Sequence, residues 1–253
     1  MADEGSIDLL KGNFLRGQLA GLEQQMLLQV FSKYISVVRG MLNDGKEATV
    51  YGCRGHHGEF FAAKVYRDRR FRAFGNESAY MNVDAVTDRR MAKAIRKRSK
   101  VGRRASQRMW VAREWEALNV LHDSNASVPQ PYDHAPDAIL MELVGEQGVA
   151  APMLAQTRMT RTEAERAWRA VLEDVEILLA CEIVHGDLSA YNILYHEHRP
   201  RLIDLPQVID LDAPGDHFPL FHRDIENVAG HFQRQGLTID PLSVAIDLWQ
   251  RYV

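Results

Sequence analysis

Residues 183–195 read IVHGDLSAYNILY and place a polar loop between two short apolar arms. The arms have the composition of β-strands. A loop held between rigid elements often places its side chains in fixed positions for binding or catalysis. This loop carries His185, Asp187 and Asn192, and a second carboxylate, Asp204, follows in the run RLIDLPQ. Asp204 ends an apolar, strand-like stretch, and we expect its side chain to face a cleft rather than the core.

The order and spacing of these polar residues predict phosphoryl-transfer chemistry. Asn192 follows Asp187 by five residues and precedes Asp204 by twelve. One carboxylate can orient or deprotonate an acceptor, while the amide and the other carboxylate hold Mg²⁺ through hard oxygen ligands. An isolated Asp in a turn more often caps the backbone. Three such residues in this order, between apolar strands, favour the catalytic interpretation.

Phosphoryl transfer from ATP also requires a cation, and the N-terminal half offers Lys64 inside the apolar stretch FFAAKVY. A Lys in such a strand is costly to bury without a partner. Glu114, in the helical stretch VAREWEAL, is the candidate partner, and the pair would fix the ammonium against the α- and β-phosphates. The alternative is an edge-strand Lys that reaches water. Upstream, Gly45 in NDGKEATVY marks a tight turn whose backbone N–H groups can cover phosphates.

The periodicity along the chain predicts an α+β fold with two lobes. An amphipathic helix is expected over residues 15–34, with Leu19, Leu22, Met26 and Val30 on one face. Three short strands follow between residues 36 and 66, then a helix over 111–122 and a buried strand over 138–145. A second helix begins near Thr162, which forms a capping box with Glu165. Its apolar face comprises Ala164, Trp168, Val171, Leu172, Val175, Leu178 and Leu179.

These elements divide the chain into an N-terminal helical extension (1–34), a β-rich N-lobe (35–143) and a short helical C-lobe (144–253). Lys64 and Glu114 are 50 positions apart, far more than a strand-to-helix turn needs, so residues 67–112 are predicted to be a mobile insertion. A glycine loop, strand Lys, helix Glu, apolar link, HxDxxxxN and Asp in this order predict a protein-kinase-like bilobal fold.

The composition is that of an ordinary globular protein, with 46% hydrophobic and 26% charged residues. No secretory leader and no apolar run long enough for a membrane span is visible. Cys53 and Cys181 form no CxxC pair, which favours a reduced, cytoplasmic protein without structural zinc.

The formal net charge of −3 conceals a strongly basic run. Residues 89–108 carry ten Lys or Arg and no acid, so subtracting their +10 from −3 leaves −13 on the rest of the chain. Two interpretations stay open. The run is either a solvated surface segment or a contact for a polyanion such as RNA or a ribosomal particle.

The combination GKEATVYGC, AAKVYRD, LMELVG, HGDLSAYNILY and LIDLPQ resembles the RIO family of atypical serine protein kinases, over roughly residues 35–235. The resemblance implies ATP and Mg²⁺ as cofactors, with Mn²⁺ as an alternative ion. It implies Asp187 as the catalytic base, Asn192 and Asp204 as metal ligands, and a structural role for His185. It further implies nucleotide contacts from the loop Gly45, Lys46, Glu47 and Ala48, from the pair Lys64 and Glu114, and from the hinge residues Glu142 and Val144.

Two departures from ordinary protein kinases sharpen this interpretation. Ser189 stands where those kinases place a Lys, two residues after the catalytic Asp. Only 49 residues follow Asp204, without an APE motif, which is too short for the usual activation segment and peptide-docking helices. The resemblance therefore implies an autophosphorylating kinase or an ATPase, with Asp204 a candidate acceptor of an aspartyl phosphate. It also implies a link to small-ribosomal-subunit maturation.

Two rival functions remain. Small-molecule phosphotransferases of the aminoglycoside or choline type also use an HGDxxxxN loop, but they tend to read HPGN where this chain has residues 189–192, and they continue into a larger helical region. An ATP-switched RNA- or ribosome-binding module with little turnover is the second rival, although all the residues needed for turnover are present.

Overall fold

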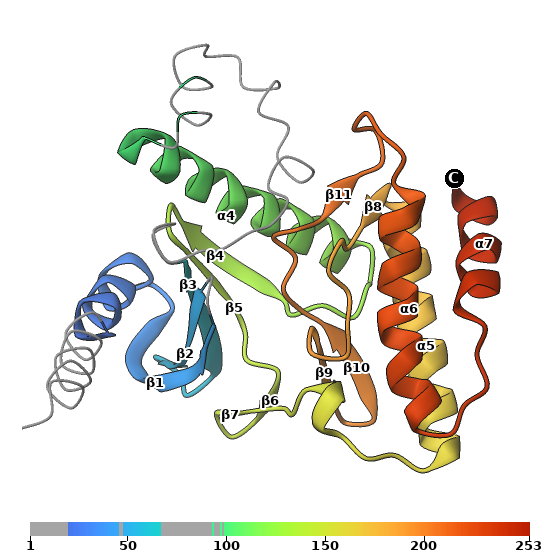
Figure 1. The fold of residues 1–253 in the computed structure, drawn as a ribbon. Helices are drawn as coiled ribbons and strands as arrows, with labels where there is room; N and C mark the ends of the chain where they lie inside the picture. The colour runs from blue at the N-terminus through green and yellow to red at the C-terminus, as the bar shows by residue number, and fades with distance from the viewer. Residues whose placement is uncertain (1–19, 46–47, 67–92, 94–96, 98) are drawn as a thin grey trace, which may run out of the picture.

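The computed structural model describes residues 20–45, 48–66, 93, 97 and 99–253. Lys46, Glu47 and eight residues of the basic run (89–92, 94–96 and 98) lie outside this part of the chain. The described residues form the expected two lobes, with a sheet in the first and helices dominating the second (Figure 1). Within them, no helix combines the length and the apolar character that crossing a bilayer needs.

The N-lobe is a five-stranded antiparallel sheet in the order β1-β2-β3-β5-β4. Its strands are β1 (Ile35–Asp44), β2 (Ala48–Gly55), β3 (Phe60–Tyr66), β4 (Pro131–Ala135) and β5 (Ala138–Glu142). The three predicted N-terminal strands and the buried strand β5 are confirmed. In β3, Phe61, Ala63 and Val65 pack on one face of the sheet, and Ala62 and Tyr66 pack on the other. Alternation along the strand places Lys64 on the second face, toward the C-lobe.

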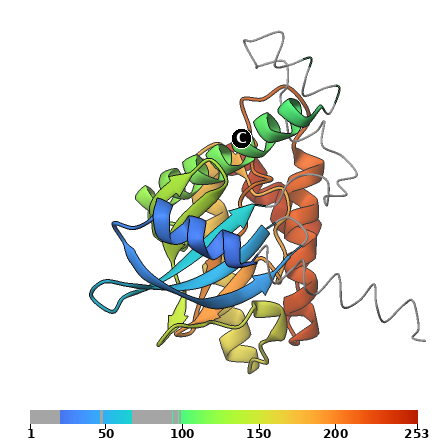
Figure 2. The ribbon, with the colours of Figure 1, turned by 90° about the vertical axis from the view of Figure 1, so that its left-hand side faces the viewer.

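A helix at residues 20–30 covers the outer face of this sheet, as Figure 2 shows. The predicted apolar face of this helix is wrong at Leu22 and Val30. Met26 packs partly buried against the cluster beneath the helix, and Leu19 lies outside the described residues. Leu27 and Phe31 are the fully buried residues, packed with Tyr51 and Phe61, whereas Leu22 is 64% and Val30 43% exposed. Leu27 and Phe31 are four residues apart and therefore lie on one side of the chain, away from Leu22.

The helix α4 (Lys100–Asp123) packs across the sheet, and residues 124–130 connect it to β4 and contact α5 (Arg161–Ala180) through the Ser127 N–H, which donates to Asp174. It begins at Lys100 rather than at residue 111, because Ser99 caps it by accepting a hydrogen bond from the Gly102 N–H (3.1 Å). The last thirteen residues of the predicted insertion, 100–112, are therefore helical. The predicted mobility of residues 67–98 falls largely outside the described residues.

The C-lobe contains three helices, α5 (Arg161–Ala180), α6 (Phe218–Arg234) and α7 (Pro241–Tyr252). Short strands lie between them and the N-lobe: β6 (Gly145–Glu146), β7 (Val149–Ala150), β8 (Ile183–Val184), β9 (Ile193–His196), β10 (Arg199–Leu202) and β11 (Ile209–Asp210), with a 3₁₀ turn, η3 (Leu154–Gln156). The apolar face predicted for α5 is confirmed, but its capping box is formed by Thr160 and Glu163 rather than by Thr162 and Glu165.

One hydrophobic core runs through both lobes. It extends from β2, β3 and α4 through β5 into α5, α6 and α7. A second, smaller cluster lies beneath the helix at 20–30. The segment IVHGDLSAYNILY sits against the main core, and its two arms are the strands β8 and β9, as predicted. The polar loop between them is therefore anchored at both ends.

Candidate active site between the lobes

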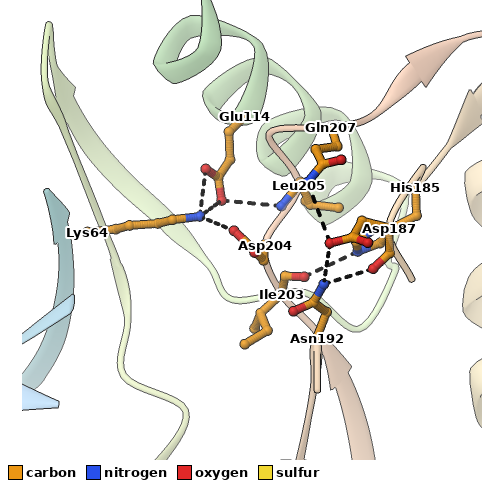
Figure 3. A network of polar contacts seen from close by, with 9 residues as sticks. All are labelled: Lys64, Glu114, His185, Asp187, Asn192, Ile203, Asp204, Leu205 and Gln207. Atoms are coloured by element: carbon orange, nitrogen blue, oxygen red, sulfur yellow. Dashed lines mark hydrogen bonds and ion pairs between the residues drawn. The ribbon is translucent and has the colours of Figure 1, made fainter. Parts of the chain in front are cut away.

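Lys64 on β3 is buried between two carboxylates that come from different parts of the chain (Figure 3). Its Nζ lies 2.7 and 2.9 Å from the Glu114 carboxylate oxygens and 2.5 Å from Asp204 Oδ1. Burial alone would lower the pKa of Lys64, but the two carboxylates outweigh burial and raise it. Burial opposes ionisation of Asp204 as well, yet Lys64 outweighs it and lowers the pKa of Asp204. Both groups are therefore charged at neutral pH.

The helix α4 is fixed so that Glu114 faces Lys64. Gln107 donates through Nε2 to the Tyr66 carbonyl (3.0 Å) and to Asp137 Oδ1 (3.1 Å), which ties the helix to the ends of β3 and β5. Glu114 is 1% exposed and also accepts a hydrogen bond from the Leu205 N–H (3.3 Å). The predicted Lys–Glu pair is thus present in the structure, and the alternative of an edge-strand Lys reaching water is wrong.

The loop after β8 brings Asp187 and Asn192 together. Asn192 donates through Nδ2 to the Asp187 carbonyl (2.8 Å) and to Asp187 Oδ2 (3.3 Å). With its amide nitrogen used in this way, the Asn192 side-chain oxygen is left as a ligand atom. Burial, followed by the charge of Asp204, raises the pKa of Asp187. A carboxyl with a raised pKa holds a transferred proton more readily, which suits a general base.

His185 connects this loop to the segment that carries Asp204. Its Nε2 lies 3.2 Å from the Ile203 carbonyl, and the side chain is buried. Because a carbonyl only accepts, Nε2 must carry the hydrogen of this bond. Burial lowers the pKa of His185 to about 4, so the ring is neutral at pH 7. This contact agrees with the structural role predicted for His185 and does not suit a proton donor.

Asp204 itself adopts a backbone conformation that non-glycine residues rarely use. Its φ is 66°, in the left-handed region. Such a conformation costs of the order of 1–2 kcal/mol and persists only where the surroundings enforce it. Here Leu205 and Pro206 are buried directly after it, and the Lys64 contact holds the carboxylate. The strain therefore coincides with the residue predicted to bind metal.

Asp224 on α6 anchors the loop between β8 and β9 through hydrogen bonds to its backbone. The sequence pattern had not indicated this residue. It is 1% exposed and accepts hydrogen bonds from the Gly186 N–H (2.7 Å) and the Leu188 N–H (3.1 Å). The neighbouring Arg223 donates to the Gly186 carbonyl. A carboxylate on the apolar face of an amphipathic helix, among Phe221 and Ile225, is the pattern that could have revealed it.

The predicted hinge residues lie at the end of β5. The Glu142 N–H donates to the Gln130 carbonyl (2.8 Å), and its carboxylate pairs with Arg201 of β10 at 2.5 Å. The Val144 carbonyl accepts from the Ala151 N–H (2.8 Å), so the Val144 N–H is the backbone group we expect to meet adenine. Gly45 closes the β1–β2 turn through its N–H, which donates to the Ala48 carbonyl at 3.0 Å. Their contacts to a nucleotide stay predictions.

A five-stranded sheet with a buried Lys–Glu pair, joined to a helical lobe that carries an Asp, an Asn and a second Asp, defines a protein-kinase-like fold. Residues 49–244 match the family model described as RIO domain. The chain therefore belongs to the RIO domain family, as the resemblance of its motifs predicted.

Curated relatives carry the same family name. Serine/threonine-protein kinase rio1 of Schizosaccharomyces pombe is 30% identical over 202 residues, which cover 79% of this chain and 39% of that protein. RIO-type serine/threonine-protein kinase Rio1 of Methanocaldococcus jannaschii is 31% identical over 219 residues, which cover 84% of this chain and 70% of that protein. This chain thus spans less than half of the fission-yeast relative.

A solved structure confirms the fold. The Rio2 kinase of Chaetomium thermophilum, in a complex with ADP/Mg²⁺ and phosphoaspartate, superposes with a TM-score of 0.66. The alignment covers 90% of this chain and 65% of that one at 18% sequence identity. At this level of identity the likeness establishes the bilobal fold, and the chemistry rests on the residues described above.

Proposed function

We propose that the chain is a RIO-type phosphotransferase that uses ATP and Mg²⁺, either as an autophosphorylating serine/threonine kinase or as an ATPase. One observation carries the proposal. The buried Lys64 contacts Glu114 from its own lobe and Asp204 from the other, beside an Asp187–Asn192 pair. An ion trio of this kind is expensive to bury for stability alone, because desolvation offsets much of its Coulombic gain. Positioning the phosphates of a nucleotide accounts for its presence.

The residues present fit a magnesium ion. Asp204 and Asn192 offer oxygen ligands of the hard type that Mg²⁺ prefers, and the Asn192 amide is oriented by Asp187. When bound, Mg²⁺ would neutralise part of the charge on the ATP phosphates. Lys64, paired with Glu114, would anchor the α- and β-phosphates.

Asp187 is proposed to accept the proton of the acceptor hydroxyl. The acceptor oxygen then forms its bond to the γ-phosphorus, while the bond between that phosphorus and the β,γ-bridging oxygen breaks and ADP leaves. A serine of this or another protein, water, or the Asp204 carboxylate could take the phosphoryl group. The Asp204 carboxylate needs no deprotonation, because its pKa is already lowered by Lys64.

Product analysis with γ-labelled ATP and Mg²⁺ tests this function. We expect ADP together with labelled phosphate or labelled protein, and a hydroxylamine-sensitive label would identify an acyl phosphate. Asp204→Asn should remove any such label. Aminoglycosides and choline, offered as acceptors, test the small-molecule alternative. ATP binding without ADP formation would contradict the proposal and favour the ATP-switched binding module.

The partner and the location of the protein belong to the same proposal. We propose that residues 89–108 contact RNA or a ribosomal particle, and that the protein acts in the cytoplasm. Ten positive charges without an acid support the first part, since phosphate contacts require charge rather than sequence recognition.

A further inference from the structure

Two side-chain amides converge on one oxygen of the Asp187 carboxylate (Figure 3). Asn192 Nδ2 lies 3.3 Å and Gln207 Nε2 lies 3.5 Å from Asp187 Oδ2. Within the described part of the chain, Oδ1 of the same carboxylate receives no hydrogen bond from a side chain. The two oxygens of the predicted base are therefore not equivalent.

We propose that Gln207 is a positioning residue for the proposed phosphoryl transfer. Together with Asn192 it holds Asp187 Oδ2, so that Oδ1 is the atom presented to the acceptor hydroxyl. This inference rests on the proposed function and adds a residue and a specific atom to it. Gln207 contacts neither the nucleotide nor the acceptor in this scheme, and acts through Asp187.

The backbone around Gln207 fixes where its side chain can reach. Leu205, Pro206 and Val208 are buried, and the Val208 N–H donates to the Leu205 carbonyl at 3.3 Å. Gln207 is the half-buried residue of this tight segment. Its amide is therefore supported by packed neighbours rather than by a free loop, which is what precise placement of a catalytic group requires.

Three residues of the segment 204–207 contact Lys64, Glu114 and Asp187 of the candidate site. Asp204 pairs with Lys64, the Leu205 N–H donates to Glu114, and Gln207 reaches Asp187. A shift of this segment would thus disturb the Lys–Glu pair and the base together. In this proposal, Gln207 couples the orientation of the Asp187 side chain to the position of the segment that carries Asp204.

The Gln207 contact is long, as catalytic hydrogen bonds often are before substrate binds, and such bonds tighten in the reacting complex. The net value of one neutral hydrogen bond corresponds to roughly a 3- to 10-fold change in an equilibrium or a rate. We therefore expect the loss of this donor to reduce kcat by about 10-fold. The KM for ATP should change little, because the amide does not contact the nucleotide.

A double-mutant cycle tests the proposal. Gln207→Met keeps the length of the side chain and removes the donor, and Gln207→Leu removes the donor without adding a charge beside Asp187. Each substitution is made in the parent and in an Asp187→Asn background. The rate of phosphoryl transfer from γ-labelled ATP is then measured under single-turnover conditions for every protein. We expect each to slow the parent about 10-fold and to cause no further loss after Asp187→Asn, because groups that act as a unit are strongly non-additive.

Gln235→Met is the matched control. Gln235 is also a half-buried amide, but it donates to the Thr157 carbonyl (3.1 Å) at another part of the C-lobe. The Gln235→Met substitution should leave kcat unchanged in the parent and in the Asp187→Asn background. Equal losses from Gln207→Met in both backgrounds, or an unchanged kcat in the parent, would overturn the inference alone. A parent that transfers phosphate to no acceptor would overturn the proposed function and this inference with it.

Discussion

Lys64 is the residue on which the stability and the proposed chemistry depend together. Lys64→Ala leaves Glu114 buried beside Asp204 without a cation, and removing one partner of a buried ion pair costs about 3–5 kcal/mol. We expect a lower free energy of unfolding in urea and a large loss of ATP affinity by calorimetry. Lys33→Ala, at an exposed position, serves as the control. Unchanged nucleotide affinity and turnover in Lys64→Ala would refute the assignment of Lys64 as the phosphate anchor.

Asp187 is expected to affect rate rather than binding. Asp187→Asn should reduce turnover by about 10²–10⁴-fold, the usual contribution of a general base. Its affinity for ATP should stay close to that of the parent, since the Lys64 contacts are untouched. Steady-state kinetics and nucleotide titration separate the two effects. Full autophosphorylation and ATPase activity in this variant would show that another group takes the proton.

At the scale of elements, local periodicity predicted the strands well and the helix boundaries less well. The apolar run FFAAKVY correctly indicated a strand that carries Lys64. The capping box was misplaced because TRTEAE contains two overlapping matches, and only tertiary packing decides that Thr160 rather than Thr162 begins α5. The start of α4 was missed because its first turns carry basic rather than apolar residues.

The supporting contacts of the site could not be predicted from local pattern. Asp224 reaches Gly186 across 38 residues, and Gln207 reaches Asp187 across 20. Motif spacing identifies residues that carry the chemistry, because their order is fixed by the reaction. A residue that positions another through a long-range hydrogen bond has no such constraint on its spacing, and it becomes visible only when the fold is known.

Asp174 on α5 provides a pH test of how the lobes are connected. It is buried, and its Oδ1 accepts from the Ser127 N–H (2.7 Å) in the link between α4 and β4. Burial raises its pKa from 3.8 to about 6. The folded protein therefore binds the proton more tightly than the unfolded chain, and this residue destabilises the fold increasingly as pH rises from about 4 through 6.

Asp174→Asn removes this titration. Relative to the parent, we expect the variant to gain free energy of unfolding as pH rises from 4 to 7, by an amount that approaches about 3 kcal/mol. Urea denaturation of both proteins across this range measures the difference. Glu116→Gln, at an exposed position of α4, serves as the control variant. A constant difference between Asp174→Asn and the parent would mean that Asp174 is ionised equally in both states.

At the scale of the whole molecule, the fold does not explain why positive charge is concentrated in residues 89–108 while the rest of the chain is acidic. The core and the candidate site use the apolar and acidic residues of the body. From residues 89–108, Gln107 fixes α4 beside the site, and the basic residues described in this run are not among the core residues. Lys93 and Lys97, which are described, are exposed. The run could neutralise the −13 body, or it could bind an external polyanion, and salt distinguishes these alternatives.

If residues 89–108 bind RNA, the affinity must fall steeply with added salt, because each phosphate contact releases condensed counterions. Replacing Arg96, Lys97, Arg98 and Lys100 with Ala should weaken binding of a structured RNA and lower the slope of log affinity against log salt by up to about 4. Fluorescence anisotropy at several salt concentrations measures both quantities. Arg161→Ala and Arg251→Ala, exchanged together, control for the loss of positive charge elsewhere. A quadruple variant with the parent's affinity and slope would show that the basic run is a solvated surface, because four lost phosphate contacts cannot leave the counterion release unchanged.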